Sequence, residues 1–186
     1  AREVWEGQSV DMRLEKKMEI SLSEYIEMIR LKTAVLLACC FEMAAKLSNR
    51  MDLAGTFYEL GIQIGLAFQL EDDWLDLYSE NSDFGKVRGG DILRAKKSAL
   101  ILELCESMNI QGRNDFLKNY MLIKDPELRL NTVTSLLNEY NIKEKLKQRI
   151  SEYKLKAHLL LSALTLNPAQ KLELENWMQL ILERRH

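Results

Sequence analysis

The stretch that decides the fold is LAGTFYELGIQIGLAFQLEDDWLDLY, residues 53–78. It contains no proline, and its apolar residues recur at helical spacing, which predicts one long helix. Setting successive residues about 100° apart brings four polar side chains onto one face near the end of this helix: Gln69, Asp72, Asp73 and Asp76. The adjoining face is apolar and consists of Leu66, Leu70, Trp74 and Leu77.

The rest of the chain carries the same helical pattern. Apolar residues make up 47% of the 186 residues, and the low content of glycine (8) and proline (2) favours helices over strands. Helix starts are indicated by a capping box, Ser21 with Glu24, and by the pairs Asp125-Pro126 and Asn167-Pro168. We predict an all-α, compact protein with helices at about 1–17, 21–47, 53–78, 92–108, 113–122, 126–140, 142–163 and 168–184. The glycine-rich segment 79–91 is expected to be a loop.

Charge and composition exclude several classes of protein. Lys and Arg (26) nearly balance Asp and Glu (28), so the chain lacks the basic character of a nucleic-acid-binding protein. The longest uninterrupted apolar stretch, Ala34 to Phe41, is too short to span a bilayer. Three cysteines form no disulfide framework and indicate the reduced core thiols of a cytoplasmic protein. The first residues are charged and lack the apolar core of a signal peptide.

Three carboxylates on one helical face need a partner, because like charges at this spacing repel each other. A site with few carboxylates plus substrate phosphates is typical of Mg²⁺. The alternative is a solvated acidic face, which is the ordinary interpretation of such a pattern. The apolar sequence that precedes Gln69 favours the metal site, and Glu71 falls on the far side of the helix.

Three cationic segments accompany the aspartates. Lys86 and Arg88 stand among three glycines in FGKVRGGD (84–91), where the backbone can approach an anion. Lys96 and Lys97 follow shortly afterwards. Lys32 and Thr33 enter an apolar run, where an ammonium and a hydroxyl suit an anion. Each segment alone is also compatible with a solvated surface or a turn.

The motifs together resemble the trans-prenyl diphosphate synthases, of farnesyl or geranylgeranyl diphosphate synthase type. The resemblance rests on GQSVDM (7–12), RLKTAVLL (30–37), GLAFQLEDDWLDLY (65–78), FGK (84–86) and GGDILRAKKSAL (89–100), in that order. It is dense over residues 4–106 and fades afterwards. It implies that residues 1–186 are the C-terminal portion of a single isoprenoid synthase-type helical domain.

The resemblance also implies an activity and roles for individual residues. The reaction is a Mg²⁺-dependent head-to-tail condensation of isopentenyl diphosphate with an allylic diphosphate. Asp72, Asp73 and Asp76 would bind Mg²⁺. Lys32, Thr33, Gln69 and Lys86 would hold the allylic diphosphate, and Lys96 would do so less directly. A homodimer is expected through residues 22–47, where Ala38, Ala44 and Ala45 would allow close helix contact.

The chain departs from this family in one large respect. Family members carry a first aspartate-rich motif and the isopentenyl diphosphate residues in their N-terminal half, and these 186 residues contain no second motif of that type. We therefore expect the chain alone to be inactive. It would be a fragment, one half of a two-chain enzyme, or a remnant with another role. The first residue is Ala rather than Met, which favours the fragment.

Alternative interpretations remain. A non-catalytic subunit could dimerise with an active synthase and tune it, although it would not need all three aspartates. A class I terpene cyclase would want a later Asn/Ser/Glu motif, and Asn81-Ser82-Asp83 has the wrong spacing. A di-metal bundle would want Glu-x-x-His pairs, which His158 and His186 do not form.

Two further expectations concern packing. Product chain length cannot be read from these residues, but Gly61 and Gly65 could leave room for a prenyl tail beside the long helix. In the last helix, Trp177 and Leu180 are expected to form the buried face.

Overall fold

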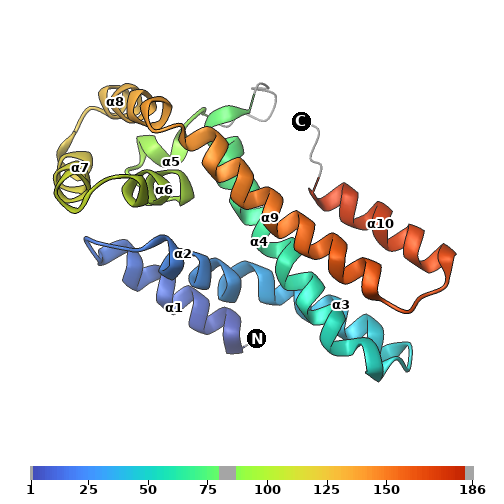
Figure 1. The fold of residues 1–186 in the computed structure, drawn as a ribbon. Helices are drawn as coiled ribbons and strands as arrows, with labels where there is room; N and C mark the ends of the chain where they lie inside the picture. Colours follow the sequence, from blue (N-terminus) through green and yellow to red (C-terminus); the bar gives the residue numbers. More distant parts are fainter. Residues whose placement is uncertain (1, 80–86, 183–186) are drawn as a thin grey trace. The chain divides into compact units, whose positions relative to one another are not determined.

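The computed structural model describes residues 2–79 and 87–182, and all regular structure in these ranges is helical (Figure 1). The prediction of an all-α fold is thus confirmed. The elements are α1 (Arg2–Lys16), α2 (Leu22–Ile29), η1 (Arg30–Ala34), α3 (Val35–Leu47), η2 (Met51–Leu53), α4 (Ala54–Tyr78), α5 (Gly90–Leu93), α6 (Ala99–Ser107), α7 (Ile110–Leu122), α8 (Pro126–Glu139), α9 (Ile142–Ala163) and α10 (Pro168–Leu182). No helix in the described ranges is both long and apolar enough to cross a membrane.

Residue contacts gather into two compact units. Unit 1 comprises Ala1–Ser9, Met28–Gln69 and Arg149–Arg185, and unit 2 comprises mainly Val10–Glu27 and Leu70–Gln148. Helices α1, α2, α4 and α9 each run from one unit into the other. The division falls inside α4, so Gln69 belongs to unit 1 and the three aspartates belong to unit 2.

Unit 1 has an apolar core built by α3, the first part of α4, the second part of α9, and α10 (Figure 1). Helices α4 and α9 contribute Leu60, Ile64, Ala157 and Leu161 to this core. The expected burial of the last helix is wrong, because Trp177 is 58% exposed and Leu180 is 71% exposed. Helix α10 instead packs on the core through Met178 and Leu182.

Glycines let the helices of unit 1 approach each other at backbone distance. A Cβ atom on Gly61 would lie 2.4 Å from Ala38 Cα, and one on Gly65 would lie 2.5 Å from Ala34 Cα. The expectation that these two glycines leave room for a prenyl tail is therefore wrong, because helix backbone fills the space.

The same contacts revise the expected dimer surface. Ala38 and Ala45 are buried within their own chain, Ala38 against Gly61 and Ala45 in the apolar core. Among the three small residues, only Ala44 is exposed. The expectation of core thiols is confirmed for Cys105, which is buried, but it is wrong for Cys40, which is exposed.

Unit 2 contains shorter helices that are held at their ends by side chains. The helix expected over 92–108 is wrong, because the chain forms α5, turns, and starts again as α6. Ala95 in the turn has a φ of 55°, a left-handed conformation that costs a non-glycine residue about 1–2 kcal/mol. The side-chain hydroxyl of Tyr120 donates to the Lys96 carbonyl at 2.7 Å and helps to hold this turn.

Two cations in unit 2 bind backbone carbonyls. Buried Arg129 of α8 donates to the carbonyls of Leu93 (2.7 Å), Tyr120 (3.2 Å) and Ile123, and thus joins the start of α8 to α5 and to the end of α7. Lys97 donates to the carbonyls of three residues at the end of α1, namely Leu14, Glu15 and Lys17. Carbonyls at a helix C-terminus lack their usual i+4 donors, and of these three the Leu14 carbonyl also accepts from the Lys17 N–H at 3.2 Å.

The predicted helix starts are confirmed. Ser21 and Glu24 form a reciprocal capping box, in which the Ser21 N–H donates to the Glu24 carboxylate (2.9 Å) and the Glu24 N–H donates to the Ser21 hydroxyl (3.1 Å). The Asp125 carboxylate accepts from two N–H groups at the start of α8. Asn167 accepts from the Gln170 N–H at 2.9 Å at the start of α10.

Candidate functional site

Lys32 and Thr33 lie in η1, a π-helical turn that separates α2 from α3. A continuous helix was expected here, and the π turn is a feature that helical periodicity does not reveal. Such turns occur frequently at functional sites, because the extra residue re-aims the side chains around it. Both side chains are partly exposed.

Two glycines press on the backbone of this turn within unit 1. A Cβ atom on Gly7 would lie 2.5 Å from Lys32 N, and the corresponding atom on Gly65 would lie 2.5 Å from Ala34 Cα. The turn that carries Lys32 and Thr33 is therefore held between α1 and α4 backbone. The glycine of GQSVDM thus has a packing role of its own, while Gln8 is exposed.

Thr33 and Gln69, two of the residues predicted to hold the diphosphate, are in contact in unit 1. The Thr33 hydroxyl donates to Gln69 Oε1 at 3.3 Å, which links η1 to α4. Both side chains are partly exposed. A hydroxyl and an amide in contact supply neutral donors and acceptors beside the Lys32 ammonium, which neighbours Thr33 in the sequence.

Asp73 is the most buried of the three aspartates, with an exposed fraction of 5%. Its Oδ2 accepts a hydrogen bond from the Tyr25 hydroxyl at 2.6 Å and another from the Ala99 N–H at 2.9 Å. Burial, followed by the charge of Asp73, raises the pKa of Tyr25 well above its ordinary value, so the hydroxyl keeps its proton and donates. Sequence reasoning missed Tyr25.

Asp76 also binds backbone. Its Oδ2 accepts from the Asp91 N–H at 3.0 Å, and its carbonyl accepts from the Gly89 N–H at 2.6 Å. Burial raises the pKa of the Asp76 carboxyl above its ordinary value, against the lowering effect of the Asp91 N–H. The end of α4 is thereby tied to the start of α5.

Asp72 is partly exposed and lies on the helix one residue before Asp73. Within residues 2–79 and 87–182, no three His, Cys, Asp or Glu side chains are grouped so that they alone could hold a metal ion. One or two carboxylates from α4 with oxygens of a bound diphosphate still match the ligand chemistry of Mg²⁺. The donor set therefore fits a Mg²⁺ that arrives with a phosphate ligand.

The predicted cationic residues are placed only in part. Lys96 is exposed and pairs with Asp91 at 2.8 Å, and Asp91 in turn pairs with Arg94 at 3.2 Å. This ion pair holds Lys96 beside the residue that Asp76 binds. Lys86 lies outside the described residues.

Glu71 belongs to a separate cluster in unit 2. Its Oε1 accepts from the Lys147 Nζ of α9 at 2.6 Å, and that ammonium also lies 4.4 Å from the centroid of the Trp74 ring. The Trp74 Nε1–H donates to the Lys143 carbonyl at 3.2 Å. This arrangement agrees with the expectation that Glu71 faces away from the aspartates, and it moves Trp74 out of the purely apolar stripe.

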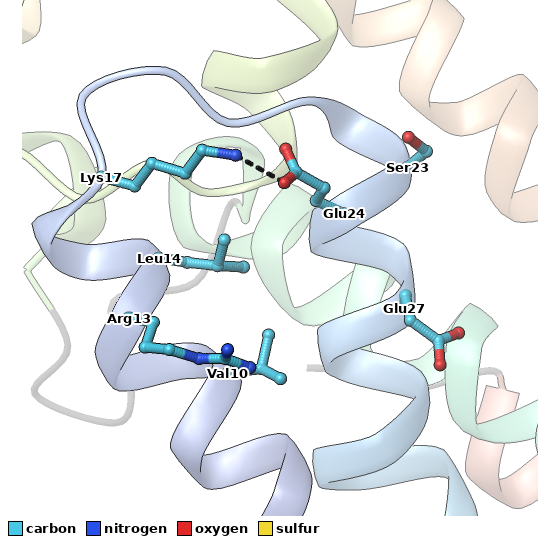
Figure 2. Close-up of a pocket in the computed structure, with 7 residues that line it drawn as sticks. All are labelled: Val10, Arg13, Leu14, Lys17, Ser23, Glu24 and Glu27. Carbon is cyan, nitrogen blue, oxygen red and sulfur yellow. Dashed lines mark hydrogen bonds and ion pairs between the residues drawn. The ribbon is translucent and has the colours of Figure 1, made fainter.

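A pocket of about 480 Å³ lies in unit 2 between α1 and α2 (Figure 2). Its lining is amphipathic and consists of Val10, Arg13, Leu14, Lys17, Ser23, Glu24 and Glu27. Lys17 pairs with Glu24 across it at 2.6 Å. Two cations and two carboxylates give the lining no net preference for an anion, which distinguishes it from the predicted diphosphate site.

The helical fold places the chain in a class of proteins, the all-α proteins of the isoprenoid synthase fold. A solved structure described as a geranylgeranyl pyrophosphate synthase superposes with a TM-score of 0.87 at 30% identity, over 99% of this chain and 58% of that one. The sequence model of the polyprenyl synthetase family matches residues 1–137. The chain belongs to the polyprenyl synthetase family.

Two curated relatives narrow the comparison. A geranylgeranyl diphosphate synthase of Methanosarcina mazei is 35% identical over 117 residues, which are 61% of this chain and 36% of the relative. A geranylfarnesyl diphosphate synthase of Natronomonas pharaonis is 37% identical over 101 residues, which are 54% of this chain and 30% of the relative. The matched part is about a third of each relative's length.

Proposed function

We propose that this chain supplies the allylic-diphosphate half of a prenyl diphosphate synthase, which condenses isopentenyl diphosphate with an allylic diphosphate. The observation that carries the proposal is the polar face of α4, on which Gln69, Asp72, Asp73 and Asp76 follow one another in a chain of the polyprenyl synthetase family. The residues are a C-terminal portion of the synthase domain in this proposal, and the protein acts in the cytoplasm.

In this proposal, the diphosphate is held by Lys32, Thr33 and Gln69 of unit 1 together with Lys86 and Lys96. The Thr33–Gln69 hydrogen bond and the packing of Gly7 and Gly65 on η1 support it, because they fix the backbone that carries Lys32. An ammonium that reaches out from this backbone would stabilise negative charge as it develops on a departing group.

Of the three aspartates predicted to bind Mg²⁺, Asp72 is the ligand proposed here, because Asp73 and Asp76 accept hydrogen bonds from the protein. When bound, the ion would supply positive charge that stabilises the departing diphosphate. Asp72 is partly exposed, so its carboxylate can receive a ligand from solvent. The apolar residues of α4 that precede Gln69 would keep water from a carbocation.

The test is calorimetric titration with farnesyl diphosphate, a representative allylic diphosphate, in Mg²⁺. Asp72→Asn should weaken binding by at least about tenfold, because charge-assisted contacts are worth about 1.5–3 kcal/mol. Asp115→Asn is the matched control, since Asp115 is exposed and accepts only a surface hydrogen bond from Gln111 at 2.9 Å in the described structure. Equal affinities for wild type and Asp72→Asn would contradict the metal assignment.

We also propose that the protein is a homodimer and that α3 forms the interface. Four side chains on one face of α3 are exposed at heptad-like spacing, namely Leu36, Cys40, Met43 and Leu47. An apolar stripe of this spacing is typical of a helix that packs on another helix. Sedimentation should show a dimer for the wild type and a monomer for Leu36→Glu/Leu47→Glu; a monomeric wild type would refute the dimer.

A further inference from the structure

The hydrogen bonds at Asp73 join three helices at one carboxylate oxygen. Tyr25 comes from α2, Ala99 from the first turn of α6, and Asp73 itself from α4, all within unit 2. Asp73 and Tyr25 are both buried, with exposed fractions of 5% and 9%. A carboxylate that accepts two short hydrogen bonds in a buried place has one strongly preferred orientation.

Helix α6 depends on this contact for its cap. Its N-cap residue, Ser98, has an extended backbone, and its own side chain makes no capping hydrogen bond. The Ala99 N–H, one of the orphan donors of a helix start, is satisfied by Asp73 from a different helix. A negative charge at this position is also favoured by the helix dipole. Asp73 therefore caps the N-terminus of α6, a role that a side chain of the N-cap residue itself ordinarily has.

The neighbouring aspartate has a different environment. Asp72 is partly exposed, whereas the next residue is buried and bound by α2 and α6. One residue along a helix is a rotation of about 100°. An anchor at Asp73 therefore fixes the direction in which Asp72 leaves the helix.

We propose that Tyr25 is a positioning residue of the aspartate motif: with the Ala99 N–H it fixes the Asp73 carboxylate as an anchor, and this anchor orients Asp72 toward Mg²⁺ and the allylic diphosphate. The inference rests on the function proposed above and divides the motif by role. Asp73 serves as a hydrogen-bond acceptor in the protein interior, and Asp72 serves as the ion's ligand.

The test compares Tyr25→Phe, Asp73→Asn and Asp72→Asn by titration with farnesyl diphosphate at several Mg²⁺ concentrations. Tyr25→Phe should raise the Mg²⁺ concentration needed for half-maximal binding by about tenfold, the effect of losing one hydrogen bond to a charged group. Asp73→Asn should stay within about threefold of wild type, because an amide oxygen can accept from both donors. Asp72→Asn should lose Mg²⁺-dependent binding.

A matched control separates positioning from loss of stability. Tyr120→Phe removes the hydroxyl of another buried tyrosine, which donates to the Lys96 backbone carbonyl at 2.7 Å rather than to an aspartate carboxylate. Both tyrosine variants should lower the melting temperature by about 2–6 °C. Only Tyr25→Phe should change the Mg²⁺ requirement.

Three results would overturn the inference. The first is a wild-type Mg²⁺ requirement in Tyr25→Phe, and the second is an equal change in Tyr120→Phe. The third is a loss in Asp73→Asn as large as that in Asp72→Asn, which would make Asp73 an ion ligand. If the proposed function itself is wrong, the result is a different one: wild type and Asp72→Asn would then show the same Mg²⁺ dependence of farnesyl diphosphate binding.

Discussion

The two units of the chain are stabilised by different means. In unit 1, long helices approach at backbone distance through Gly7, Gly61 and Gly65, and an apolar core fills the rest. In unit 2, side chains such as Asp73 and Arg129 reach across to bind the ends of short helices. The predicted diphosphate residues of η1 are thus held by packing, and the aspartates are held by hydrogen bonds.

This difference follows from helix length. Every helix leaves about four N–H and four C=O groups unsatisfied at its ends, so short helices need proportionally more partners. Helices α5 and α6 of unit 2 have four and nine residues, whereas α3 and α10 of unit 1 have 13 and 15. Unit 2 meets this need with polar side chains, and Asp73 and Asp76 make two of these contacts, with the N–H groups of Ala99 and Asp91.

The largest effect is expected from a substitution that disturbs the close helix packing of unit 1. Gly61→Ala should lower the free energy of unfolding by about 3 kcal/mol or more, because its Cβ would lie 2.4 Å from Ala38 Cα and backbone must move. Urea denaturation measures this change. The matched control is Gly55→Ala in the same helix, where no atom lies within 4 Å of the new Cβ. There a gain of about 0.5–1 kcal/mol is expected, and equal losses in both variants would refute the close approach.

The second largest effect is expected when the hydrogen bonds of Arg129 in unit 2 are removed. Arg129→Met keeps much of the side-chain volume but leaves the carbonyls of Leu93, Tyr120 and Ile123 without their donor. Unpaired buried acceptors of this kind should cost about 3 kcal/mol in total. Hydrogen exchange should show lower protection in α5 and α8. A fall in the free energy of unfolding below about 1 kcal/mol would mean that the hydrogen bonds of Arg129 are not needed for stability.

The smallest expected effect is a pH-dependent change in stability from the ion pair of Lys17 and Glu24 in unit 2. The Lys17 ammonium, with the Ser21 N–H, lowers the pKa of Glu24 from 4.5 to about 2. A lowered carboxyl pKa stabilises the fold fully above pH 4.5, and this stabilisation is lost as the pH falls toward 2.

Glu24→Gln tests this pair without removing the capping box, because Gln also serves at this position. The loss at neutral pH should be only about 0.5 kcal/mol, since the pair is solvent-exposed and screened. Thermal melts of both proteins should converge as the pH falls below 4.5. A difference that persists unchanged at pH 2 would show that the ion pair is not its cause.

Local signals in the sequence predicted much of the fold. The capping residues Ser21, Asp125 and Asn167 and the uninterrupted apolar pattern of 53–78 predicted helix starts and the length of α4 to within a residue. These features depend on neighbours in the sequence. The break at Ala95 could not be predicted, because alanine favours helix locally and only tertiary contacts hold the turn.

The helix that carries the predicted aspartates could be identified from the sequence, but the partners of these aspartates could not. Spacing alone indicates that Gln69, Asp72, Asp73 and Asp76 share a face of α4. Tyr25 and Asp73 are 48 positions apart in the sequence and meet only in the folded chain. The π turn at Lys32 is likewise packed by glycines from distant parts of the sequence. Periodicity carries no information about such contacts.

The central claim is that this chain binds an allylic diphosphate through Mg²⁺. The most direct measurement is titration of the wild-type chain with farnesyl diphosphate, once in Mg²⁺ and once in a chelator of divalent ions. We predict saturable binding in Mg²⁺ and a loss of at least about tenfold in affinity with the chelator, as expected when charged ligands lose their counter-ion. Identical binding in both buffers, or no binding in Mg²⁺, would contradict the claim.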